Sequence, residues 1–70
     1  MNSSKDIRRN NLKWLAKSVG GITALAKMLN KSQSQISHLI GLNPIKNIGD
    51  KLANQVERMF NKPHGWMDHE

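Results

Sequence analysis

The chain has 70 residues, no cysteine and a formal net charge of +6 at pH 7. This length allows one small domain, and the absence of cysteine excludes disulfide bonds and thiolate zinc sites as sources of its stability. No uninterrupted apolar run exceeds three residues and no signal-peptide pattern opens the sequence, so we expect a cytoplasmic chain without a membrane partner. The surplus of basic residues favours a polyanionic partner instead.

The basic side chains are concentrated in the first half of the chain. Residues 1–31 hold seven Lys and Arg residues against Asp6 alone, which accounts for the whole net charge. Residues 32–45 contain no charged side chain other than histidine, and residues 46–70 are balanced. A single lysine is most often just solvated, but this asymmetry as a whole favours a surface that faces phosphate groups.

The first two predicted helices are amphipathic and short. The first covers residues 5–18, where apolar residues recur at spacings of three and four, and Gly20 can end it in the left-handed conformation. The second covers about residues 22–29 and is interrupted at Asn30, because asparagine tolerates a positive φ. Together they predict a helical chain, and no alternating strand pattern appears.

The second half of the chain continues the helical pattern. A third helix at residues 33–40 follows Ser32, which together with Gln35 matches the spacing of a capping box. A fourth helix is expected after Asn47, which can act as its N-cap. One further helical turn is expected at residues 63–67.

The helix pair at the centre is the most informative feature. Ala26 is small enough for a close helix crossing, and Asn30 suits the tight turn between the two helices. Ile36 and Leu39 then face back towards the core. This spacing of a small residue, a turn residue and two apolar residues is typical of a helix-turn-helix.

These residues resemble the phage lambda-type repressor and Cro family of helix-turn-helix domains. The resemblance covers residues 7–67 and is carried by three segments: TALAKMLNKSQSQISHL at 23–39, NIGDKLA at 47–53 and PHGWMD at 63–68. The last two are similar to the DNA-binding domains of temperate-phage repressors in particular. Two departures stand out: Asn30 replaces a customary glycine, and Ile22 replaces a glutamine that often grips a phosphate.

The resemblance implies a fold and a function. The fold would be all-α, a compact four- to five-helix lambda-repressor-like domain with its helix-turn-helix at about 22–40. The function would be sequence-specific binding of double-stranded DNA as a phage-type transcriptional repressor, with helix 33–40 in the major groove of a pseudo-palindromic operator.

The exposed face of the third helix supplies the base-reading candidates. It carries neutral amides, hydroxyls and an imidazole, which can donate to or accept from base edges while basic residues elsewhere hold phosphates. The candidates are Gln33, Ser34, Ser37 and His38. Gln35 stays ambiguous, because the capping box can occupy its side chain.

The phosphate-contact candidates lie at helix starts, in the turn, or after the reading helix, where this family typically touches the DNA backbone. They are Thr23, Lys31, Ser32, Asn43, Lys46 and Asn47. The candidates for flanking contacts are Lys5, Arg8 and Arg9.

The resemblance also implies a homodimer on DNA, weak or monomeric in isolation. The apolar end of the chain offers a candidate dimer patch of Phe60, Trp66 and Met67, although these residues could equally cap the monomer core. We expect residues 1–70 to form a single domain with a short N-terminal arm at 1–4. The chain would be either a Cro-like protein or the piece of a repressor that precedes an oligomerisation domain.

Other functions have less support in the sequence. No nucleophile–base constellation appears, so we expect no enzyme, no cofactor and no small-molecule substrate. His38, His64 and His69 lack metal-ligand spacing, and Trp14 and Trp66 are interpreted as packing residues. The alternatives left open are an antitoxin-like or regulator-binding module that does not read bases, and a membrane-surface role for the basic first helix.

Overall fold

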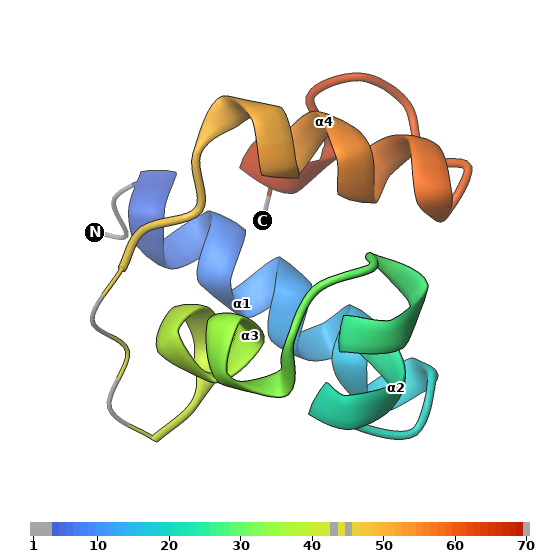
Figure 1. Cartoon of the computed structure of the whole chain (residues 1–70). Coiled ribbons are helices and arrows are strands. Elements are labelled where there is room, and N and C mark those ends of the chain that lie inside the picture. Colours follow the sequence, from blue (N-terminus) through green and yellow to red (C-terminus); the bar gives the residue numbers. More distant parts are fainter. Residues whose placement is uncertain (1–3, 43, 45, 70) are drawn as a thin grey trace.

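Helices follow one another along the chain in the predicted order (Figure 1). They are α1 (Ser4–Ser18), α2 (Ile22–Met28), α3 (Gln33–Ile40), α4 (Asp50–Met59) and a 3-10 turn, η1 (Trp66–Asp68). The computed structural model describes residues 4–42, 44 and 46–69, and these contain no strand. The all-α prediction is therefore confirmed, while Asn43, the arm up to residue 3 and the side chain of Lys5 lie outside the described residues.

Three of the helices end in the same local motif. The second residue after the end of α1, α2 and α4 is Gly20, Asn30 or Asn61, with φ of 106°, 56° and 56° respectively. In each case the next amide donates to a carbonyl five residues earlier, at N···O distances of 2.7, 2.9 and 2.7 Å. This is the Schellman motif, which supplies donors to the last helical carbonyls. The predicted left-handed conformations of Gly20 and Asn30 are confirmed.

The start of α3 also follows the sequence prediction. Ser32 Oγ accepts a hydrogen bond from the Gln35 amide at 3.1 Å, and Gln35 Oε1 accepts one from the Ser32 amide at 2.9 Å. This reciprocal pair is the predicted capping box, and it holds the first turn of α3 in place.

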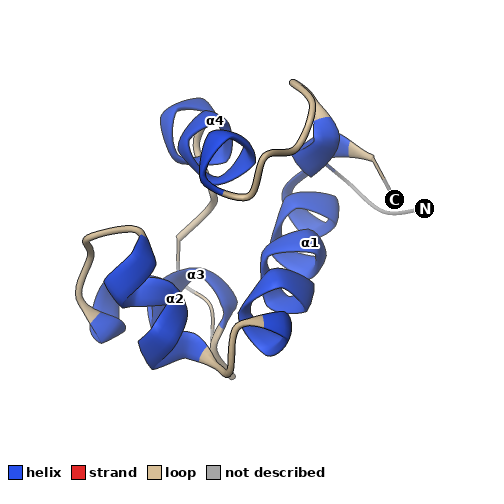
Figure 2. Ribbon diagram, turned by 90° about the vertical axis from the view of Figure 1, so that its right-hand side faces the viewer, coloured by secondary structure: helices blue, strands red, loops and turns tan. Residues whose placement is uncertain are grey.

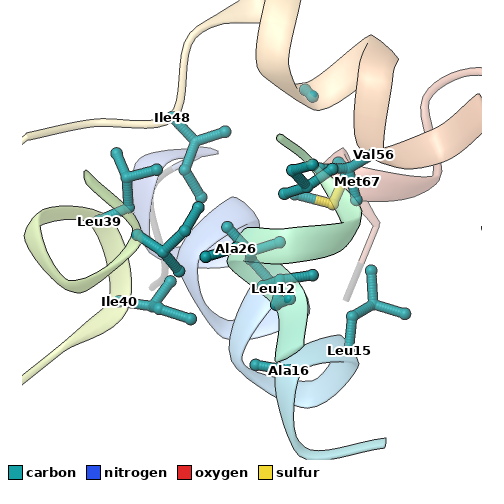
Figure 3. Packing of buried hydrophobic residues seen from close by; sticks show 13 residues of the cluster. Leu12, Leu15, Ala16, Ala26, Leu39, Ile40, Ile48, Val56 and Met67 are labelled. Atoms are coloured by element: carbon teal, nitrogen blue, oxygen red, sulfur yellow. The ribbon is translucent and has the colours of Figure 1, made fainter. Parts of the chain in front are cut away.

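The core gathers apolar side chains from every helix (Figure 3). Its buried members are Leu12, Leu15, Ala16, Leu25, Ala26, Leu29, Ile36, Leu39, Ile40, Ile48, Ala53, Val56 and Met67. Helix α1 contacts α2, α3 and η1, and α2 packs against α3, so the helix pair predicted from the sequence rests on α1. With no disulfide to help, burial of these side chains is the main source of stability.

The start of α4 differs from the prediction. Asn47 is not its N-cap, since Gly49 holds that position and the helix begins at Asp50. The reason is tertiary: Ile48 is buried in the core ahead of the helix, and Asn47 Oδ1 accepts a long hydrogen bond from Arg9 at 3.5 Å. The predicted last turn is also shifted, to a short 3-10 turn at Trp66–Asp68.

The C-terminal turn lies beside the start of α1 (Figure 2), and Arg8 of α1 forms an ion pair with Asp68 of that turn. Its guanidinium donates to both carboxylate oxygens of Asp68, at 2.6 and 3.2 Å, and to the Ile48 carbonyl at 3.0 Å. It also pairs with Asp50 at 2.9 Å. The hydrogen bond from Arg8 lowers the pKa of the Asp68 carboxyl, and the same carboxylate raises the pKa of Arg8.

This pairing predicts a loss of stability in acid. Because the pKa of Asp68 is lower in the folded chain than its ordinary 3.8, the ionised carboxylate stabilises the fold above that value. The stabilisation is lost as the pH falls through the lower folded pKa. In thermal melts from about pH 6 down to about pH 2, Asp68→Asn should melt below the unchanged protein at the upper end and approach it at the lower end. A difference between the two melting temperatures that stays constant with pH would contradict this role of the pair.

Two further groups hold the C-terminal turn. The Asn11 side-chain amide donates to the carbonyls of Met67 and His69, at 2.9 and 2.7 Å. Glu57 is buried, and its Oε2 accepts a hydrogen bond from the Met67 amide at 2.9 Å. Met67 is itself fully buried. Its side chain therefore belongs to the monomer core, which is the second of the two roles that the sequence left open for Met67, and it has no exposed surface to offer a second chain.

Candidate nucleic-acid interface

Helix α3 separates a buried face from an exposed one. Ile36, Leu39 and Ile40 are buried, while Gln33, Ser34 and His38 are exposed and Ser37 is half-buried. In the described part of the chain, the side chains of the four base-reading candidates form no hydrogen bond with other protein groups. Their donors and acceptors are therefore available to an external partner, and they are carried on a helix whose first turn is closed by the capping box.

The side chain of Gln35 is partly occupied. Its carbonyl oxygen belongs to the capping box, which leaves its amide N–H groups for an outside acceptor. Ser32 uses its hydroxyl oxygen as an acceptor in the same box, so its hydroxyl proton is still able to donate. Both residues can still donate a hydrogen bond to a phosphate, but each already accepts one within the capping box.

Two lysines distant in sequence come together beside α3. Lys31 from the turn and Lys46 from the loop line one shallow pocket of about 140 Å³, together with Gln35 and His38. The Lys46 amide donates to the His38 carbonyl at 3.0 Å, which brings the loop back to the last turn of the helix. The two lysines thus lie beside the helix that carries the neutral base-reading candidates, and phosphate contacts and base contacts would come from different residues.

The remaining phosphate candidates have different surroundings. Thr23 is exposed in the first turn of α2, while Ile22, in the place where the family often has glutamine, is half-buried against the core. Asn47 is exposed, and its side-chain oxygen lies within a long hydrogen bond of Arg9.

The two arginines of α1 are held inside the fold. Their side chains are 17% (Arg8) and 19% (Arg9) exposed. Arg8 binds Asp68 and Asp50, and Arg9 donates to the carbonyl of Leu39 at 2.9 Å. Hydrogen-bond partners 30 to 60 residues away leave no pattern in the sequence. The sequence therefore predicts these arginines only as flanking surface charges.

The aromatic residues do not all pack as expected. Trp14 is 59% exposed, so it packs at the surface and not in the core. Its ring lies 6.3 Å from that of Trp66, and Lys62 Nζ lies 5.8 Å and 5.0 Å from the two ring centroids. Phe60 and Trp66 are half-buried beside the core and retain some surface.

Among the residues that the structure describes, no three histidine, cysteine or carboxylate side chains are grouped so as to hold a metal ion. None of the described helices is both long enough and apolar enough to cross a membrane.

The chain is similar to a known repressor along its whole length. All 70 residues align with the prophage repressor CohE of Escherichia coli strain K12 at 40% identity, and the chain spans 31% of the length of that repressor. No family model and no solved structure matches the chain. The identity over the full chain supports the phage repressor helix-turn-helix family for these residues, as the resemblance of the helix pair predicted.

Proposed function

We propose that this chain is a double-stranded DNA-binding domain of a phage-type transcriptional repressor, with α3 reading an operator in the major groove. The observation that carries the proposal is the exposed, uncharged face of α3, with Lys31 and Lys46 together in one pocket beside the same helix. The prophage repressor to which the chain is similar supports the repressor role. Such a protein would act in the cytoplasm of the bacterial host.

The chemistry of the exposed face suits base edges. The Gln33 amide can pair with adenine N6 and N7, and an imidazole N–H of His38 can donate to guanine N7 or O6. Ser34 and Ser37 can donate or accept. Lys31 and Lys46 would neutralise phosphates beside α3, which orients the helix without reading sequence.

One such helix reads too few base pairs to select a site in a genome, so we propose that two copies bind a pseudo-palindrome with half-sites one helical turn apart. Phe60 and Trp66 keep enough surface to take part in contact between the copies, whereas the buried Met67 does not.

The test is selection from a randomised duplex pool at about 0.15 M salt, where non-specific binding is weak. An enriched pseudo-palindrome would support both the base reading and the dimer. A single enriched half-site would support the base reading and reject the dimer. No enrichment, with binding that vanishes as salt rises, would reject the proposal in favour of a protein-interaction module.

Replacing Gln33 by alanine should weaken binding to the selected site by about 1–3 kcal/mol and relax the preference at one base position. Binding to random duplex should hardly change, because the amide carries no charge to attract phosphates. Both affinities can be measured by fluorescence anisotropy at one salt concentration. Equal losses on both duplexes would reject a base-reading role for Gln33.

Lys31→Ala and Lys46→Ala should each reduce the slope of log affinity against log salt by about one unit, on specific and random DNA alike. Arg58→Ala is the matched control, since it removes the same charge from an exposed position near the end of α4, away from α3 (Figure 1). If all three variants change the slope equally, the effect reflects net charge and the two lysines lose their assignment.

A further inference from the structure

The C-terminal end of α3 lacks the local motif that closes the other helices. After α1, α2 and α4 the chain turns through a left-handed residue, but Gly41 after α3 has φ of −72° and ψ of −168°, which is extended backbone. Glycine is needed there for a different reason, because a Cβ would lie 2.6 Å from the Ser37 carbonyl oxygen. The last carbonyls of α3 must therefore find donors elsewhere.

Two of those donors come from distant parts of the chain. The Ser37 carbonyl accepts locally, from the Gly41 amide at 2.8 Å. The His38 carbonyl accepts from the Lys46 amide at 3.0 Å, and the Leu39 carbonyl accepts from Arg9 Nε at 2.9 Å. The end of the helix that carries the base-reading candidates is thus secured by tertiary contacts, one of them from α1.

Arg9 also reaches the segment that leaves α3. Its Nη2 lies 3.4 Å from the Lys46 carbonyl and 3.5 Å from Asn47 Oδ1, and its Nη1 lies 3.5 Å from Asp6 Oδ1. One planar guanidinium therefore joins α1, the last turn of α3 and the segment at 46–47, which runs beside the start of α1 (Figure 1). Its positive charge also lies at the negative end of the α3 dipole.

We infer that Arg9 is a positioning residue for base reading, one that holds α3 and Lys46 in fixed relation, rather than a residue that binds phosphate. The inference rests on the proposed function, because it assigns α3 to the bases and Lys46 to the DNA backbone. If the guanidinium is lost, α3 keeps its capping box and buried face but gains freedom at its far end. Contacts to bases depend on that alignment, whereas attraction to phosphates does not.

The experiment compares Arg9→Met and Arg9→Lys with the control Lys13→Met, which removes one charge from an exposed position of the same helix. Affinity is measured on the selected site and on random duplex, well below the melting temperature of each variant. In both Arg9 variants we expect the ratio of specific to random affinity to fall at least about tenfold, because the ammonium group of lysine is a point charge and lacks the guanidinium fork. The control should keep the ratio of the unchanged protein.

A phosphate contact would give a different pattern. Arg9→Met would then lose affinity equally on both duplexes, and Arg9→Lys would recover it, since lysine also binds phosphate. That outcome would overturn the inference.

Amide hydrogen exchange separates this inference from the proposed function, because it needs no DNA. In Arg9→Met, the amides of Gly41 and Lys46 should exchange at least about tenfold faster than in the unchanged protein. The rates are normalised to the amides of Gly21 and Lys62, which close α1 and α4. Unchanged relative exchange would overturn the inference even if the chain binds DNA. Faster exchange in a chain that selects no duplex would leave the coupling of Arg9 to α3 standing and reject its role in base reading.

Discussion

Ile36→Ala is expected to lower the free energy of unfolding by about 2–5 kcal/mol, the largest effect that we predict for a single side chain. Ile36 is 0% exposed and lies on the buried face of α3. Its truncation removes apolar contacts and leaves a cavity that the surrounding helices can fill only in part. A domain of this length has a total stability of roughly 4–10 kcal/mol, so the loss would be a large share of it.

The measurement is urea denaturation followed by circular dichroism at 222 nm. Ser34→Ala is the matched control, because it shortens an exposed side chain on the same helix. Its stability should stay within about 0.5 kcal/mol of the unchanged protein. If both variants unfold at the same urea concentration, Ile36 is not a core residue and the orientation of α3 is wrong.

The second large effect is expected from overpacking at the helix crossing. Ala26 is 3% exposed on α2, which packs against α3 (Figure 3). A leucine at this position has no space, so it must separate the two helices or take a strained rotamer, at a cost of about 1–3 kcal/mol. A leucine that separates α2 from α3 would displace α3 in the fold, so specific DNA binding should fall together with stability.

The control for this substitution is Lys27→Leu, which places the same side chain at the next, exposed position of α2. It should change the melting temperature little, whereas Ala26→Leu should lower it by about 4 °C or more. A normal melting temperature in Ala26→Leu would show that the two helices do not cross at this residue.

Local signals in the sequence predicted much of the fold. The capping box joins Ser32 and Gln35, and the turns at Gly20 and Asn30 are closed by hydrogen bonds between residues at most five positions apart. Such interactions depend on residue type and spacing, which are readable without a structure. The buried face of α3 follows from its helical period in the same way.

The sequence predicts less well where the contacts of a residue come from distant parts of the chain. Asparagine is a residue type that often caps helices, but Ile48, next to Asn47, is buried in the core and α4 starts only at Asp50. Trp14 fits an apolar helical pattern, yet it lies on the surface beside Trp66 and Lys62. The tertiary packing decided both cases, because its contribution to the free energy of folding is larger than that of local helix propensity.

The candidate site shows the same division. The sequence predicts which face of residues 33–40 is exposed, because the buried apolar residues leave only amides, hydroxyls and an imidazole on the other side. It also determined the excess of positive charge in the first half of the chain. The packing of the helices, by contrast, brings Lys46 back beside Lys31, and it places Arg8 against Asp68 and Arg9 against the end of α3. Charge and helical period are properties of neighbouring residues, whereas the partner of an arginine 30 or 60 residues away is chosen by how the helices pack.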